Sequence, residues 1–238
     1  MAFVKHEWHL GSYTLDLGYN PEPLKKLGDI LDAQVDKTKD PLLAEHIRNM
    51  LVKFGFLHFS KLFLMETIKG KQLATHYHLL NFIVLTKAFL DAVANIINHF
   101  YQLGFIGSKI DLKLQSFRDK LANFDQDLSN DIFIQKNWIE KVVNMRDEII
   151  HRKSPLIIYY SKADETGKQP KERTVRMPIE PVSLFEWSKD ESYLKNKYGK
   201  VEQDILPFCE DWIKNSDVLL CATCQRIVNF IEKQSKST

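Results

Sequence analysis

The sequence has few of the residues that cross-link or interrupt a fold. It has only three cysteines in 238 residues, too few for a closed disulfide framework. Of its eight prolines, none lies between Pro41 and Pro155, and glycine is scarce in the same span. Because proline costs about 3 kcal/mol inside a helix, this long span without proline predicts stacked helices.

Neither positive nor negative charge dominates the sequence. The chain has 33 Lys and Arg against 31 Asp and Glu, a net charge of +2. This balance excludes a histone-like polycation but allows a local phosphate site. The longest run without a charged residue, 72–86, is too short to span a bilayer, and the first residues lack the apolar core of a signal peptide. We therefore expect a cytoplasmic protein with reduced thiols and no membrane contact.

What is present is typical of a soluble globular protein, with 44% apolar and 27% charged residues. The length suits a single helical domain over 1–238. We expect an N-terminal extension and long helix (1–70), bundle helices (71–155), an insertion (156–180) and C-terminal helices (181–235). The predicted helices are Pro21–Asp36, Asp40–Lys69 with Asp40 as N-cap, Lys71–Leu103, Lys113–Asn123, Ser129–Lys153 with Ser129 as N-cap, and Val201–Lys233, with a possible break at Pro207.

The insertion differs in pattern from the rest of the chain. Two β-prone runs, Leu156–Ser161 and Thr174–Ile179, flank a polar turn that contains glycine and proline. This pattern predicts a β-hairpin, or at least a protruding loop.

The predicted helix Ser129–Lys153 divides cleanly into an apolar and a polar arc on a wheel of about 100° per residue. The apolar arc contains Ile134, Trp138, Ile139, Val142, Val143, Met145, Ile149 and Ile150. Two polar residues interrupt it, Gln135 near the start and Arg146 near the end. Burying an unpaired guanidinium costs several kcal/mol, so Arg146 should meet an anion, a partner subunit or a wet cleft.

Two interpretations of Arg146 remain open at this point. It would form an internal ion pair, for example with Asp91, or extend to solvent at the helix end. Alternatively it would clamp a phosphate, because planar guanidinium groups match phosphate oxygens. His151 follows five residues later, where Pro155 forces the chain out of the helix. It is either an ordinary cation at a helix end or a general acid or base beside the arginine.

The segment RDEIIHR, from Arg146 to Arg152, resembles the Arg-x(4–6)-His motif of the HEPN superfamily. A polar residue usually follows the arginine in that family, and Asp147 fits. The segment Lys87–Asn98 further resembles the second bundle helix of HEPN proteins, which often carries an acidic residue facing the motif. Asp91 is the matching candidate. The resemblance covers roughly residues 71–233.

The resemblance implies an up-and-down helical bundle that forms a homodimer, with two copies of the motif facing each other in a cleft. In catalytic members this cleft cleaves RNA without a metal ion or another cofactor. His151 would be the general acid or base, Arg146 would stabilise the charge on phosphorus, and Asp91 would orient one of them. Many members bind nucleotides or protein partners without catalysis.

Basic and polar residues around the motif are candidates for contact with nucleic acid. Residues 151–176 hold seven Lys or Arg and three acids, a local charge of +4 that would steer a phosphate backbone or simply solvate a hairpin. The candidates are Arg152, Lys153, Lys87, Asn95, Arg173 and Arg176.

Other chemistries lack their signatures. The pair Cys221 and Cys224 has CxxC spacing but falls within a predicted helix without a second such pair, so core packing explains it better than zinc. There is no HExxH, phosphate-loop, GxGxxG or GxSxG pattern. The sequence therefore predicts an all-α, HEPN-like protein acting on RNA or nucleotides, without metal. The alternative is a catalytically silent helical module that binds nucleotide, nucleic acid or a protein partner.

Overall fold

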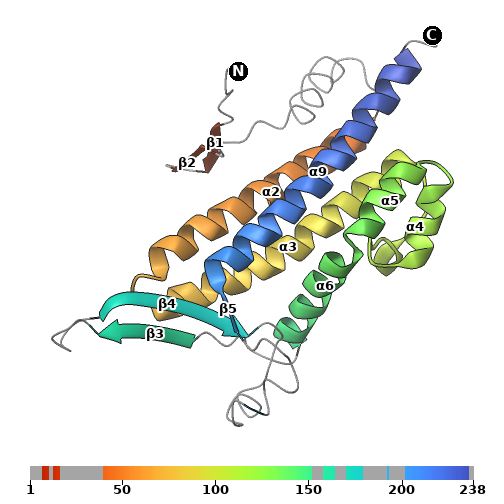
Figure 1. Ribbon diagram of the computed structural model, residues 1–238. Coiled ribbons are helices and arrows are strands. Elements are labelled where there is room, and N and C mark those ends of the chain that lie inside the picture. Colours follow the sequence, from red (N-terminus) through yellow and green to blue (C-terminus); the bar gives the residue numbers. More distant parts are fainter. Residues whose placement is uncertain are drawn as a thin grey trace. The chain divides into compact units, whose positions relative to one another are not determined.

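The computed structural model describes residues 7–10, 13–16, 40–151, 158–163, 170–178, 192 and 202–235. Within these ranges the fold is all-α with a small β-hairpin, as the long span without proline predicts. The α-helices are α2 (Pro41–Thr67), α3 (Gln72–Phe100), α4 (Gln115–Ala122), α5 (Gln126–Ile134), α6 (Lys136–His151) and α9 (Ile205–Ser235) (Figure 1). The short helix expected at residues 21–36 lies outside the described ranges.

The chain forms two compact units. The first comprises Met1–His58, Ala88–Glu140 and Lys214–Thr238, and the second comprises Phe59–Lys87 and Lys141–Ile213. In the first unit α2 and α3 meet through Phe54 and Phe89, whose ring centroids lie 5.7 Å apart. In the second unit Trp212 of α9 is buried against Phe82 of α3 and Phe208. Each unit therefore has an aromatic core of its own.

The start of α2 follows from its sequence. Asp40 Oδ1 accepts a hydrogen bond of 3.1 Å from the backbone N–H of Leu43, which makes Asp40 the N-cap. Pro41 occupies the first helical position, where its missing N–H leaves no bond unmade. The predicted start of this helix is confirmed.

The predicted single helix Ser129–Lys153 is wrong. The chain forms α5 and α6 instead, separated at Gln135, and the N-cap of α5 is Asp125, whose side chain accepts from Leu128 N–H at 2.9 Å. Ser129 lies inside α5, where its buried hydroxyl donates to the carbonyl of Arg118. A serine hydroxyl that bonds to a distant part of the chain is not available to cap a helix. The local sequence pattern does not show that bond, and so it predicted the wrong helix start.

The break also changes which side chains are buried. Ile134, the last residue of α5, is 79% exposed and does not join the apolar arc. The break at Gln135 places it on a different helix from the rest of the arc. Gln135 is itself buried, and its Oε1 has no hydrogen-bond partner within the described residues, nor has Nε1 of Trp138. The rest of the arc is buried as predicted at Ile139, Val142, Val143, Met145 and Ile149, whereas Ile150 is exposed.

Helix α3 is the most apolar helix described. By length and composition it is the one helix in the described ranges that would be able to cross a membrane, and 56% of its most apolar window is buried inside the protein. A central helix of a helical core has the same composition, so this finding alone does not indicate a membrane span.

Short strands complete the fold. β1 (Glu7–Leu10) and β2 (Tyr13–Asp16) form an antiparallel pair that the sequence analysis did not predict. β3 (Ile158–Ala163) and β4 (Pro170–Pro178) form the predicted hairpin, and β5 (Glu202–Asp204) pairs with β4 and leads directly into α9 (Figure 1). Pro207 lies in the first turn of α9, where proline is tolerated, and α9 continues without a break.

Candidate functional site

The candidate residues Arg146 and His151 lie in the C-terminal part of α6, in the second unit. Arg146 is flanked along the helix by the buried residues Met145 and Ile149, yet its own side chain is 34% exposed. Its Nη1 donates to Oδ1 of Asp147, the next residue, at 2.9 Å. The guanidinium is therefore neither deeply buried nor unpaired. Its long side chain reaches water from an apolar side of the helix.

This pair is a weak one. The Asp147 side chain is 48% exposed, and ion pairs between exposed side chains contribute about 0–1 kcal/mol. A stronger anion would thus displace Asp147 at little expense in free energy. The carboxylate that partners Arg146 is the neighbour in sequence, while Asp91, the candidate from the sequence, belongs to the first unit.

His151 is the last residue of α6. The predicted end of this helix, at about Lys153, lies outside the described residues. The side chain of His151, and all of Arg152 and Lys153, lie outside the described part of the structure.

The candidate residues on α3 divide between the two units. Lys87 belongs to the second unit, whereas Asp91 and Asn95 belong to the first. All three are partly exposed. Asn95 Nδ2 donates to the backbone carbonyl of Asp91 at 2.7 Å, one turn earlier. The amide thus serves its own helix, and only part of its hydrogen-bonding capacity is left for a ligand.

The hairpin carries the remaining candidates. Arg176 of β4 is exposed, and its Nε donates to Oδ1 of Asp204 in β5 at 3.0 Å. Arg173 pairs in register with Ser161 of β3, and its side chain lies outside the described part. The hairpin thus brings these basic positions onto one sheet, with one of them bound to a neighbouring acid.

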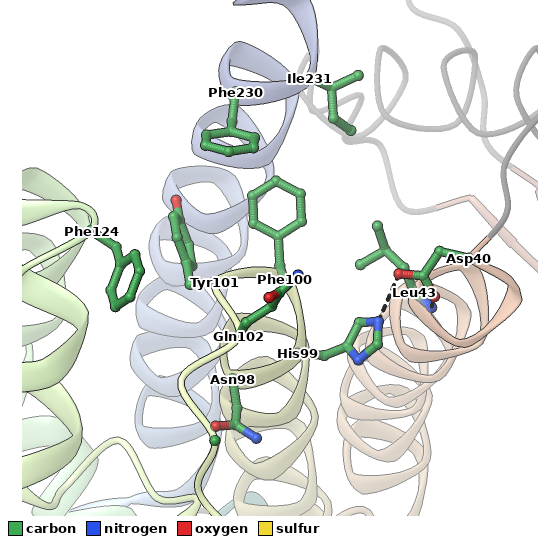
Figure 2. Close-up of a pocket in the computed structure, with 11 residues that line it drawn as sticks. Asp40, Leu43, Asn98, His99, Phe100, Tyr101, Gln102, Phe124, Phe230 and Ile231 are labelled. Atoms are coloured by element: carbon green, nitrogen blue, oxygen red, sulfur yellow. Dashed lines mark hydrogen bonds and ion pairs between the residues drawn. The ribbon is translucent and has the colours of Figure 1, made fainter. Parts of the chain in front are cut away.

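The first unit contains a large open cavity of about 1010 Å³ that sequence reasoning missed. It lies between the start of α2, the end of α3 and the last turns of α9 (Figure 2). His99 points toward Asp40, and its Nε2 lies 2.8 Å from Oδ2 of that residue (Figure 2). Partial burial raises the pKa of Asp40, but hydrogen bonds from His99 and from Leu43 N–H outweigh it and hold that pKa below its ordinary value.

The end of α3 shapes this cavity. The N–H of Leu103 donates to the carbonyl of Asn98, and the N–H of Gln102 donates to that of His99, which together form a Schellman motif. Gln102 occupies its left-handed position with φ of 52°, where glycine is usual. The aromatic side chains Phe100, Tyr101 and Phe230 pack edge to face beside it.

These cavity rings are largely structural. The Tyr101 hydroxyl donates to Oδ2 of Asp125 at 2.8 Å, which ties the end of α3 to the start of α5. Burial and this hydrogen bond raise the pKa of Tyr101. A signal for the cavity existed in the sequence only as scattered residues, because Asp40 and His99 are far apart in the chain.

Metal and thiol chemistry have no support in the described residues. No group of three or more His, Cys, Asp or Glu side chains there would hold a metal ion. Cys209 and Cys224 are buried free thiols, and burial raises the pKa of both. The prediction of core packing for the pair Cys221 and Cys224 is confirmed for Cys224, whereas Cys221 is only partly buried.

No family model, curated protein or solved structure matches this chain.

Proposed function

We propose that this chain acts on RNA as a HEPN-like, metal-independent endoribonuclease whose active site is completed by a second copy of the chain. The observation that carries the proposal is the state of Arg146. Its guanidinium emerges from an apolar helix face close to the end of α6, and among the described residues its ion-pair partner is the half-exposed carboxylate of Asp147. RNA phosphate would replace that carboxylate and form a bidentate contact.

The chemistry would be an internal transfer at phosphorus. The ribose 2′-oxygen attacks the adjacent phosphorus, the bond from phosphorus to the 5′-oxygen breaks, and the products are a 2′,3′-cyclic phosphate and a 5′-hydroxyl. One copy of His151 would take the 2′-hydroxyl proton, and the copy in the second chain would deliver a proton to the departing 5′-oxygen. Arg146 would stabilise the negative charge that accumulates on the phosphoryl oxygens.

Basic and polar side chains outside the motif would attract the RNA. Arg176 is exposed on β4, and its pair with Asp204 is open to solvent, so it would exchange readily with a phosphate. Arg152, Lys153, Lys87, Asn95 and Arg173 are proposed as further contacts. Such contacts would weaken as salt rises, because binding releases counterions from the RNA. We expect the protein to act on RNA in the cytoplasm.

A second candidate function rests on the same ion pair. If Arg146 remains paired with Asp147 in solution, the motif would have no catalytic activity. The chain would then be a helical module that binds nucleotide, nucleic acid or a protein partner. The distance of 2.9 Å between Arg146 Nη1 and Asp147 Oδ1 favours this candidate.

One experiment separates the two. Purified protein is incubated with mixed RNA in EDTA beside Arg146→Ala, His151→Ala and Asp91→Asn variants, with Arg48→Ala, an exposed arginine of α2, as the matched control. The proposal predicts cleavage to cyclic phosphate ends that falls at least 100-fold in the first two variants and is unchanged in the control. Cleavage retained in both variants would overturn it, and RNA binding without cleavage supports the silent module.

A further inference from the structure

The sequence suggested that Arg146 is a buried arginine on an apolar helix face, but the arginine that the structure buries is Arg118. Arg118 of α4 is only 6% exposed, although it carries a full charge. Its Nη1 donates to the carbonyls of Leu112 and Lys113 at 2.8 and 2.7 Å. Among the described residues no carboxylate lies within ion-pair distance of it. A buried charge in this state is expensive unless an anion balances it.

The two bonds from Nη1 use only part of the donor capacity of Arg118. A guanidinium has five N–H groups, and Nη1 supplies two of them, which leaves Nε and Nη2. These two nitrogens form the side edge that grips a phosphate or carboxylate with two parallel hydrogen bonds. Arg118 lines a groove of about 370 Å³ within the first unit, formed by α4, α5 and the start of α6. This volume falls in the range of small-molecule sites.

The other lining residues suit an organic phosphate better than a bare ion. Lys136 adds a second cation. Its Nζ lies 3.7 Å from Oε1 of Glu140, which is a loose ion pair. Phe133 presents a ring that is 61% exposed, which would stack on a planar group. Side-chain amides of Gln115, Gln126 and Asn130 also line the groove. Gln126 Nε2 donates to Asn130 Oδ1 at 3.0 Å, and the donors and acceptors that this bond leaves over would bond the edges of such a ring.

One lining residue opposes an anion. Asp119 carries a carboxylate at the groove, exposed and next to Arg118 in sequence. A carboxylate repels phosphate but accepts hydrogen bonds from ribose hydroxyls. The mixture of a buried cation, an exposed ring and a carboxylate thus matches a ribonucleotide, which carries a group for each.

We propose that the groove between α4 and α5 binds a ribonucleoside monophosphate, with Arg118 holding the phosphate and Phe133 stacking on the base. This site is independent of the motif at Arg146. It involves no covalent step.

The test uses isothermal titration calorimetry of the full chain with 5′-AMP, inorganic phosphate and adenosine as separate probes. We expect 5′-AMP to bind at least tenfold more tightly than either fragment. Phe133→Ala should weaken 5′-AMP at least fivefold without changing phosphate, and Lys136→Ala should weaken both. Phe124→Ala, an aromatic residue of similar exposure outside this groove, should change neither.

Three results would overturn the proposal. They are the absence of 5′-AMP binding, equal affinity for 5′-AMP and phosphate, and wild-type affinity in an Arg118→Lys variant that circular dichroism shows to be folded. Lysine keeps the charge but loses the two-pronged contact, so this variant should bind 5′-AMP at least fivefold more weakly. Arg146→Ala should leave 5′-AMP binding unchanged, so a failed nuclease assay and a failed titration point to different sites.

Discussion

Arg118 and Arg146 both lie on the apolar side of a helix, but they sit in opposite electrostatic situations. Arg118 is 6% exposed and donates to two backbone carbonyls, whereas Arg146 is 34% exposed and donates to a neighbouring carboxylate. A helical wheel gives the direction of a side chain and not its depth. Arg146 extends to water near the end of α6, while Arg118 is enclosed by the chain segment that precedes α4.

The largest expected effect is on stability, and it tests this contrast directly. Arg118→Ala removes two charge-assisted hydrogen bonds and leaves two carbonyls without that donor, so it should lower the free energy of unfolding by about 3 kcal/mol. Arg146→Ala should lower it by no more than about 1 kcal/mol, because its pair is exposed. Urea titrations followed by circular dichroism measure both, and equal losses would mean that the contrast in burial carries no energetic weight.

A smaller gain is expected at the end of α3. Gln102→Gly removes the strain of a left-handed φ at the Schellman position, so it should raise the free energy of unfolding by about 1 kcal/mol. Asn123→Gly, at a helix end with φ of −69°, is the control and should not stabilise. The gain should also appear in the Arg118→Ala background, since Arg118 bonds to the carbonyls of Leu112 and Lys113 and not to Gln102. Its loss there would show that the two positions are coupled.

Acid should weaken the folded state, and it should do so alike in both arginine variants. Burial lowers the pKa of His46 in the first unit and of His76 and His78 in the second below their ordinary value of 6.5. The neutral histidines therefore contribute stability that is fully present above pH 6.5 and is lost as pH falls through their folded pKa values. Thermal melting between pH 7.5 and 5 measures the loss. Both variants keep the three histidines, so a different slope in Arg146→Ala would contradict this account.

The smallest effect is expected from the weak pair itself. Asp147→Asn should change the free energy of unfolding by less than about 0.5 kcal/mol, since both side chains of the pair are partly exposed to water. It should nevertheless tighten RNA binding, because Arg146 loses its competing carboxylate. Filter binding at fixed salt measures this, with Glu140→Gln as the control in the same helix. Weaker RNA binding by Asp147→Asn would indicate that Asp147 holds Arg146 in place for the ligand.

Much of the fold follows from local sequence signals. The span without proline predicts the helices, Asp40 and Pro41 mark the start of α2, and the β-prone runs locate the hairpin. The break at Gln135 could not be predicted, because it depends on tertiary partners such as the one that Ser129 finds at the Arg118 carbonyl.

The candidate sites were harder to predict from the sequence than the fold. The spacing of Arg146 and His151 marked them as candidates in the sequence, and both residues belong to α6. Arg118 gave no signal, because its burial depends on how α4 packs against the preceding loop and α5. The pair of Asp40 and His99 likewise exists only once α2 and α3 have come together.

The two indole rings described above, Trp138 in the first unit and Trp212 in the second, give the molecule a built-in pair of reporters. With Trp8 and Trp187 replaced by phenylalanine, and one of the remaining pair replaced in turn, the emission from each ring would follow the hydration of its own surroundings. The two melting curves would then reveal whether both halves of the protein unfold in a single cooperative step or one after the other.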